Sequence, residues 1–307
     1  MPLQRIANID RLRILAVIGI VWFHTEGAPG SRIAYAGLPV FLLICFSLVV
    51  KRSHIGTTKR FLRRRWDRLL KPWLFWSAMY GLCKLAYTVC TGSLGSLSEL
   101  VSVETLFIGT NIHLWYLPYA FVSGLIVYQC NRWTSRTNNI VIVFVATIIG
   151  ILTLIGYALA RCHYRLPEPL PQWEFGLSAM PLGFAVGRCL VLPSHHVQRS
   201  LLLMICLTTV ASCVVLNGLG YASPAIPYGL AVSLVCLAYS RQGRSDAFVE
   251  AVVPLTFGIY LIYPLVAFVL RRLPLANLHF TLFIALTVCI SGLMTVALIK
   301  TPARRFV

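Results

Sequence analysis

Long apolar runs separated by short basic segments make up most of the chain. Ten runs are each close to the roughly 20 residues that an α-helix needs to cross about 30 Å of hydrocarbon. Because these runs are continuously apolar and do not alternate, they predict helices and not the strands of a membrane barrel. We therefore expect an all-α integral membrane protein, a polytopic bundle of about ten transmembrane helices. The runs are centred on residues 11–27, 34–50, 70–90, 113–130, 139–160, 175–191, 199–217, 225–239, 252–270 and 279–299.

Composition supports a membrane protein and excludes several other classes. Apolar residues make up 58% of the 307 residues and charged residues 12%, whereas about a quarter of a soluble globular protein is charged. The chain is therefore not expected to be a soluble enzyme, a disordered protein or a coiled coil. Most of its 10 cysteines fall within or beside apolar runs and lack metal-ligand spacing. We interpret them as small buried hydrophobic residues.

The distribution of basic charge predicts the orientation. The net charge is +18, which in a soluble protein would suggest nucleic acid, but cytoplasmic loops of membrane proteins are rich in Lys and Arg. With a cytoplasmic N-terminus, 20 of the 27 Lys and Arg residues fall on the cytoplasmic side and 5 on the outer side. We predict that both termini are cytoplasmic, that membrane lipid is a partner and that nucleic acid is not. Arg271 and Arg272 fit this orientation badly, because they fall on the outer side.

Two polar residues within the first apolar run, Arg13 and His24, are candidates for chemistry. They are eleven residues apart, which is close to three helical turns or about 16 Å along one helix face. Both side chains are therefore predicted to face one interior cavity, with Arg13 near its cytoplasmic mouth. An ionisable group inside a span is costly and marks a functional site, and histidine is the usual general base near neutral pH. The alternative is that Arg13 extends to lipid headgroups and His24 caps the outer helix end.

Five segments resemble one protein family. The opening, in which Asp10, Leu12, Arg13, Leu15 and Ala16 precede His24, is similar to the Arg-x10-His signature of the acyltransferase 3 family of membrane acyltransferases. Segments 40–43, 61–73, 113–118 and 257–264 resemble further motifs of this family in the same order. The resemblance spans nearly the whole chain. It implies a single transmembrane acyltransferase domain over residues 1–307.

Three departures from the family pattern change what is expected. Cys45 and Phe46 stand where the family usually has Ser-Gly, which implies altered packing or an altered acceptor pocket. Tyr263 replaces a late histidine, so we assign it no catalytic role. Family members often carry an appended extracytoplasmic hydrolase-like domain. Here Val307 follows the last apolar run directly, and no appended soluble domain is expected.

The resemblance implies transfer of an acyl group, usually acetyl from acetyl-CoA, to a hydroxyl. The expected acceptor is a cell-surface or exopolysaccharide glycan or its lipid-linked precursor, and the expected location is a bacterial cytoplasmic membrane. His24 would remove the proton from the acceptor, and Arg13 would bind the donor or stabilise the oxyanion. Arg65 and Arg68 share a helix face at a spacing of three, and guanidinium suits the phosphates of coenzyme A. The alternative is that both arginines belong to a positive-inside cluster that contacts headgroups.

His113 and Trp115 are candidate acceptor-binding residues, because the motif includes them and sugar rings stack on aromatic faces. The alternative is the aromatic belt found at membrane interfaces.

The sequence has no His-Glu-x-x-His or similar motif, so no metal is expected. A competing hypothesis is a transporter or flippase for an anionic lipid-linked glycan, which predicts paired half-repeats. A structural subunit, with Arg13 and His24 facing lipid or water, is a third possibility.

Overall fold

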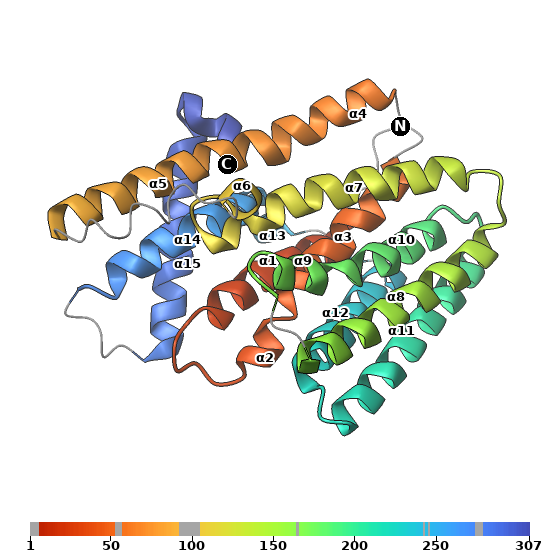
Figure 1. Cartoon of the computed structure of the whole chain (residues 1–307). Helices are drawn as coiled ribbons and strands as arrows, with labels where there is room; N and C mark the ends of the chain where they lie inside the picture. Colours follow the sequence, from red (N-terminus) through yellow and green to blue (C-terminus); the bar gives the residue numbers. More distant parts are fainter. Residues whose placement is uncertain are drawn as a thin grey trace.

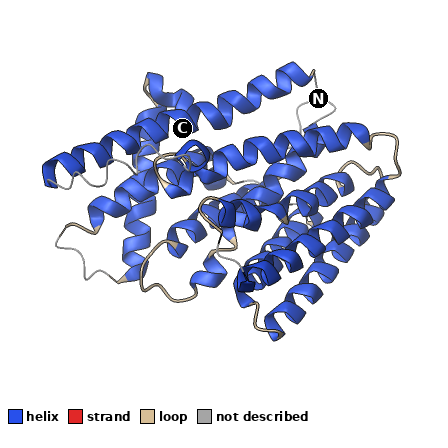
Figure 2. Cartoon of the chain, viewed as in Figure 1, coloured by secondary structure: helices blue, strands red, loops and turns tan. Residues whose placement is uncertain are grey.

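The computed structural model describes residues 6–52, 57–91, 105–163, 166–241, 243–244, 246–273 and 279–307. All regular secondary structure in these ranges is helical, and no strand occurs there (Figure 2). The prediction of an all-α protein is therefore confirmed.

The helices follow one another along the chain and pack as a bundle (Figure 1). Most are α-helices, and η marks the π-helical turn η1 and the short 3₁₀ helices η3, η4 and η5. In chain order they are α1 (Ala7–Phe23), α2 (Ser31–Ala34), α3 (Gly37–Arg52), α4 (Thr58–Arg65), η1 (Trp66–Leu70), α5 (Lys71–Thr91), α6 (Thr105–Ile108), η3 (Ile112–Trp115), α7 (Tyr116–Trp133), α8 (Asn139–His163), α9 (Leu170–Leu177), α10 (Ala179–Cys189), α11 (His195–Gly218), α12 (Ala222–Ser240), α13 (Ala247–Val252), η4 (Val253–Leu255), α14 (Thr256–Leu270), α15 (Phe280–Ile299) and η5 (Pro302–Phe306).

Six segments of the described chain are long and apolar enough to cross a membrane. They are Ser31–Arg52, Asn139–Arg161, His195–Gly218, Ser223–Ser240, Ala247–Leu270 and Phe280–Ile299. The chain is thus a multi-pass α-helical membrane protein. The other four predicted runs, at 11–27, 70–90, 113–130 and 175–191, also lie on helices. Those helices fall short in length or hydropathy, so a total of ten crossings stays a prediction.

Two clusters of buried side chains hold the helices together. One cluster draws on α3, α7, α8, α10, α11 and α12, in which α3 packs on α10 and α11 packs on α12. The other joins α5, α14 and α15 with the second half of α1. Leu12 of α1 belongs to the first cluster, and Val17 and Ile20 belong to the second. Helix α1 therefore lies between the two clusters.

Small residues bring α1 close to α2 and α3. A Cβ atom on Gly37 would lie 2.3 Å from the carbonyl oxygen of Ala16, and one on Gly19 would lie 2.8 Å from the carbonyl oxygen of Ala34. In a bilayer, helices associate through such close packing, because lipid tails are as apolar as the side chains. The two glycines thus fix the position of α1 against its neighbours.

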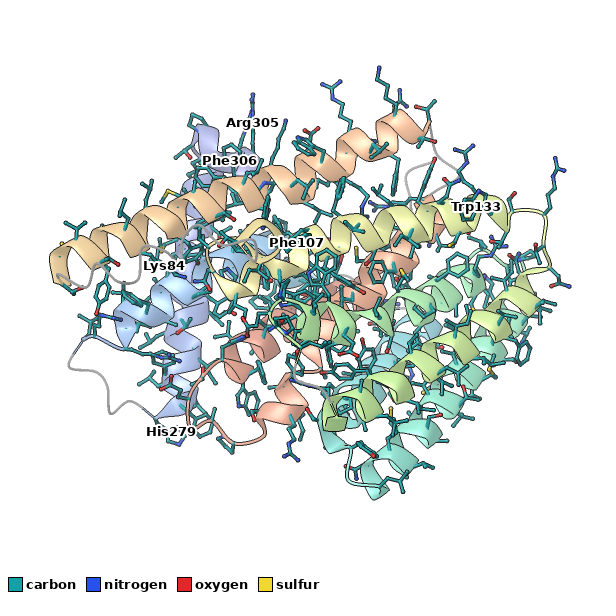
Figure 3. All side chains as sticks on the ribbon, in the orientation of Figure 1. Lys84, Phe107, Trp133, His279, Arg305 and Phe306 are labelled. Atoms are coloured by element: carbon teal, nitrogen blue, oxygen red, sulfur yellow. The ribbon has the colours of Figure 1, made fainter. Side chains whose placement is uncertain are left out.

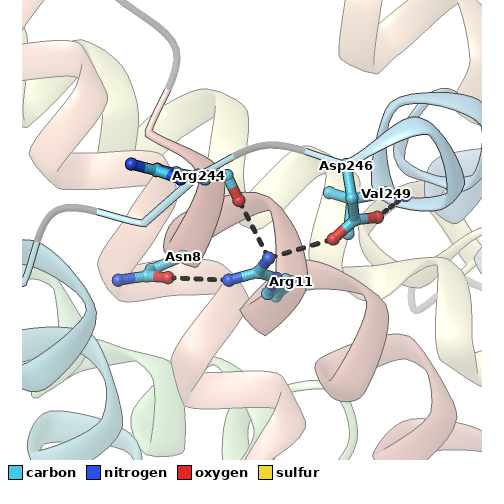
Figure 4. Close-up of polar contacts among 5 residues, drawn as sticks. All are labelled: Asn8, Arg11, Arg244, Asp246 and Val249. Carbon is cyan, nitrogen blue, oxygen red and sulfur yellow. Dashed lines mark hydrogen bonds and ion pairs between the residues drawn. The ribbon is translucent and has the colours of Figure 1, made fainter.

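Polar contacts tie the start of α1 to the segment between α12 and α13 (Figure 4). Arg11 donates to the carbonyl of Arg244 at 2.8 Å and to the carboxylate of Asp246 at 2.9 Å. Asn8 donates to the carbonyl of Arg241 at 2.9 Å. These contacts join segments that are 233 positions apart in the sequence.

Candidate functional site

A cavity of about 850 Å³ lies between α1, α3, the α4–η1 segment, α14 and η5. Among the described residues that line it, seven are arginines and one, Asp67, is acidic. The carboxylate of Asp67 pairs with Lys71 at 2.6 Å, and this hydrogen bond lowers the pKa of Asp67. Asp67 therefore stays ionised, its negative charge is neutralised by the charge of Lys71, and the cavity lining has a large excess of positive charge. The arginines are Arg13, Arg52, Arg64, Arg65, Arg68, Arg304 and Arg305.

Three residues that the sequence analysis selected, Arg13, Arg65 and Arg68, meet at this cavity although they come from two separate segments. The π-helical turn η1 explains part of this arrangement. A π turn widens the helix, and such turns are frequent at functional sites. Residues 64, 65, 67, 68 and 69 all line the cavity, whereas a regular α-helix, which turns by about 100° at each residue, spreads such a series over about 200° of its circumference.

Arg65 is held in place by α7. Its guanidinium donates to the carbonyl of Ala120 and lies 3.8 Å from Sγ of Cys45. A Cβ atom on Gly124 would lie 2.2 Å from a terminal nitrogen of Arg65, so only glycine leaves room for this side chain. The guanidinium also lies 5.6 Å from the ring centre of Phe61. Cys45, one of the departures from the family pattern, thus lies in the cavity wall beside a predicted donor-binding residue.

The C-terminal η5 closes one side of the cavity with Arg304 and Arg305. Trp76 of α5 donates from Nε1 to the carbonyl of Phe306 at 2.9 Å, and the rings of Phe75 and Phe306 stack at 4.4 Å. Figure 3 labels Arg305 and Phe306 next to α5. These contacts bring to the site two distant arginines that the sequence analysis did not select.

His24 lies directly after the last residue of α1. Its Nδ1 is 2.9 Å from the carbonyl oxygen of Ile20 and 3.2 Å from the hydroxyl of Tyr263. Because a carbonyl oxygen can only accept, the first contact assigns the hydrogen to Nδ1. The lone pair is then on Nε2, which is the form a general base requires.

The prediction that Arg13 and His24 face one cavity is wrong for this structure. The cavity is lined by Arg13 and Ile20 of α1, but not by His24. The physical reason is that α1 ends at Phe23, so His24 leaves the helical face that Arg13 and Ile20 follow. The more buried part of the lining, here called the inner end, is mostly apolar and includes Tyr116 and Tyr260.

A layer of aromatic side chains connects that inner end to His24. The ring of Tyr260 lies 6.4 Å from that of Tyr263, and the ring of Tyr263 lies 5.7 Å from that of His24. Tyr260 also donates to the backbone carbonyl of His113. Tyr263 and His24 do not line the cavity, so His24 is separated from the cavity lining by the contacts from Tyr260 to Tyr263 and from Tyr263 to His24.

His113 and Trp115 point in different directions. The His113 ring packs against Tyr80, Tyr260 and Tyr263 at 5.1 to 5.8 Å. It is 5% exposed, and neither ring nitrogen has a hydrogen-bond partner among the described residues. The Trp115 ring packs on Tyr119 at 5.5 Å, in the other buried cluster. The two residues do not form one wall, and their acceptor-binding role stays a prediction.

Two neighbouring arginines that the sequence analysis did not select form defined contacts, and one of them, Arg271, contacts the His24 region. Arg271 donates to the carbonyl of His24 at 2.9 Å and to Glu26 at 3.0 Å. Arg272 stacks on Phe268, with 3.4 Å between the guanidinium carbon and the ring centre. These contacts explain why two arginines occur on the predicted outer side. The only sequence signal was their misfit to the charge rule.

Comparison with known proteins agrees with this picture of a membrane-embedded site. A family model described as an acyltransferase domain, Acyl_transf_3, matches residues 6–296. No curated protein and no solved structure is significantly similar to the chain. The family match covers nearly the whole chain and includes Arg13, His24, Arg65 and Arg68. The chain therefore belongs to the acyltransferase 3 family of membrane acyltransferases.

Proposed function

We propose that the protein is a membrane O-acetyltransferase that uses acetyl-CoA. The acceptor is a hydroxyl of a cell-surface or exopolysaccharide glycan or of its lipid-linked precursor. The enzyme works in a bacterial cytoplasmic membrane with both termini in the cytoplasm. The observation that carries the proposal is the cavity with seven arginines and one neutralised acid.

The two ends of the cavity match the two parts of coenzyme A. The arginines at the mouth suit its phosphates, because guanidinium groups bind phosphate oxygens with charge-assisted hydrogen bonds. The inner end is lined by Ile20, Phe41, Ile44, Tyr116 and Tyr260, which suits the uncharged arm that ends in the thioester. The volume of about 850 Å³ is within the usual range for small-molecule sites.

In the proposed reaction, Nε2 of His24 takes the proton from the acceptor hydroxyl. The hydroxyl oxygen attacks the thioester carbonyl, the new C–O bond forms, the C–S bond breaks, and coenzyme A leaves as a thiolate that takes up a proton. Because Tyr260 and Tyr263 form the chain of ring contacts between the cavity lining and His24, the proposed mechanism requires these rings to move before the thioester reaches His24. The proposal therefore includes movement of these two rings during turnover.

The test is transfer of radiolabelled acetyl from acetyl-CoA to a crude membrane glycan acceptor. His24→Asn is the sharpest variant, because its amide NH₂ keeps a donor for the Ile20 carbonyl but has no basic nitrogen. We expect about a 10²- to 10⁴-fold loss of transfer, the usual contribution of a general base. His279→Asn is the matched control, because His279 is exposed and its side chain hydrogen-bonds only to Thr281 among the described residues.

Each outcome has a defined meaning. Loss of transfer in His24→Asn alone supports both the activity and the base. Equal transfer in the wild type and His24→Asn keeps the acyltransferase and removes His24 from the mechanism. A wild-type protein that neither transfers label nor binds coenzyme A saturably contradicts the proposal and favours a transporter.

A further inference from the structure

A second cavity, of about 410 Å³, lies where the ends of α3 and α12 meet the start of α11. It shares no lining residue with the arginine cavity described above. Five basic residues line it, and no acidic residue does so in the described part of the chain. They are Lys51, His195, His196, Arg199 and Arg241.

Three of these basic side chains lack a counter-charge among the described residues. Within the ranges that the structure describes, the side chains of Lys51, Arg199 and Arg241 form no hydrogen bond or ion pair. Only the backbone carbonyl of Arg241 is engaged, by Asn8. Like charges gathered around one cavity repel each other, and an anion between them removes that repulsion. The cavity therefore has the chemistry of an anion site.

The rest of the lining shows what kind of anion fits. Beside the cations the wall includes the apolar side chains of Ile6, Leu190 and Leu202. A free inorganic anion makes no use of such a wall, but an anion with a hydrocarbon part does. The lining is thus amphipathic and suits an amphipathic ligand.

Helix α11 continues from this cavity along an exposed apolar face. Leu203, Leu207 and Val214 lie four, eight and fifteen residues after Arg199, which places all four on one side of the helix. The three apolar side chains are 57%, 58% and 64% exposed. In a membrane protein such a row faces lipid tails, so Arg199 lies at the headgroup end of a lipid-facing surface.

We propose that this second cavity binds the phosphate headgroup of an anionic membrane lipid, with its acyl chains along α11. Basic pockets between helices on the cytoplasmic side are known to favour such headgroups. The proposal is independent of the acyl-transfer reaction, because the two cavities have no residue in common.

The experiment measures binding of acyl-labelled phosphatidylglycerol to the purified full-length protein in detergent. Phosphatidylcholine with the same chains and inorganic phosphate are the competitors. The test variant is Arg199→Gln with Arg241→Gln. The matched control is Lys59→Gln with Arg136→Gln, which removes two exposed charges that line neither cavity.

We expect the wild type and the control to prefer phosphatidylglycerol over phosphatidylcholine, and the test variant to bind it about ten- to thirtyfold more weakly. If the double variant does not fold, Arg199→Gln alone, at an exposed helix position, is expected to weaken binding about fivefold. Equal weakening in the control, or no preference for phosphatidylglycerol in the wild type, overturns the proposal. Displacement of the lipid by millimolar inorganic phosphate also overturns it and identifies a free-phosphate site instead.

Discussion

The hydroxyl oxygen of Tyr263 lies 3.2 Å from Nδ1 of His24. The resemblance to the acyltransferase 3 family had led us to assign Tyr263 no catalytic role, because the family has histidine there. The structure shows that its hydroxyl is a second acceptor for the Nδ1 hydrogen, which already points at the carbonyl of Ile20. Tyr263 therefore orients the imidazole, and under the proposed function it is a positioning residue.

Tyr263→Phe tests this role, because it removes the hydroxyl and keeps the ring that packs on His24 and His113. We expect kcat to fall about two- to tenfold, the net worth of one hydrogen bond. The KM for acetyl-CoA should stay the same, because Tyr263 does not line the arginine cavity. Steady-state kinetics separate the two parameters. Tyr263→His should have a higher kcat than Tyr263→Phe. An unchanged kcat in Tyr263→Phe would contradict the assignment.

Arg271 holds the turn that carries His24. Its side chain donates both to the carbonyl of His24 and to Glu26. Arg271→Ala removes both bonds, and we expect transfer to fall about three- to tenfold as the turn loosens. Glu26→Gln removes only an exposed ion pair, since the Glu26 side chain is 85% exposed, and such pairs contribute little. Its activity should stay within about twofold of the wild type.

The control for Arg271 is its neighbour. Arg272→Ala removes a stacked cation on Phe268 and no contact with His24. Transfer assays on the three variants should rank Arg271→Ala well below Glu26→Gln and Arg272→Ala. If all three lose activity equally, the effect is a general loss of charge and the positioning role is wrong.

The sequence predicted the helices well, because each apolar run has few ways to satisfy its backbone in a membrane except as a helix. The resemblance also selected Arg13, Arg65 and Arg68, because each belongs to a short motif that a sequence alone reveals, and the structure places all three at one cavity. These parts of the structure depend on composition and short-range spacing.

The remaining parts depend on tertiary packing, which spacing alone does not reveal. The end of α1 at Phe23 turns His24 away from the face of Arg13, and eleven-residue spacing assumes that the helix continues. Arg304 and Arg305 reach the cavity only because Phe306 docks on α5. Contacts between residues more than two hundred positions apart have no signature in a single sequence.

Acid should weaken the junction between α1 and α13. The backbone N–H of Val249 and the Arg11 guanidinium bond to the Asp246 carboxylate and lower its pKa. A lowered folded-state pKa means that the stabilisation is complete above the unfolded value of about 3.9. It is lost as the pH falls below that value and through the folded-state pKa.

Asp246→Asn isolates this effect, because asparagine is also a good N-cap but does not ionise. Thermal unfolding in detergent from about pH 6 to about pH 3 should show a gap between wild type and variant that closes toward acid. A gap that stays constant over this range would show that the ion pair with Arg11 does not stabilise the fold.

Gly124 controls the position of Arg65 and offers a test of the donor site. A Cβ atom there would lie 2.2 Å from the Arg65 guanidinium, so Gly124→Ala must displace Arg65 from the carbonyl of Ala120. We expect the KM for acetyl-CoA to rise about tenfold, because a charge-assisted bond to phosphate contributes roughly 1.5–3 kcal/mol. Thermal unfolding checks that the fold survives the change.

Gly156→Ala in α8 is the matched control, because nothing lies within 4 Å of the added methyl group. Alanine is the better helix former by about 0.5–1 kcal/mol, so this variant should keep its KM and unfold at the same or a higher temperature. A normal KM in Gly124→Ala would mean that Arg65 does not bind the donor where it now lies. A raised KM in Gly124→Ala and in Arg65→Ala, but not in Gly156→Ala, would place a phosphate of acetyl-CoA at Arg65.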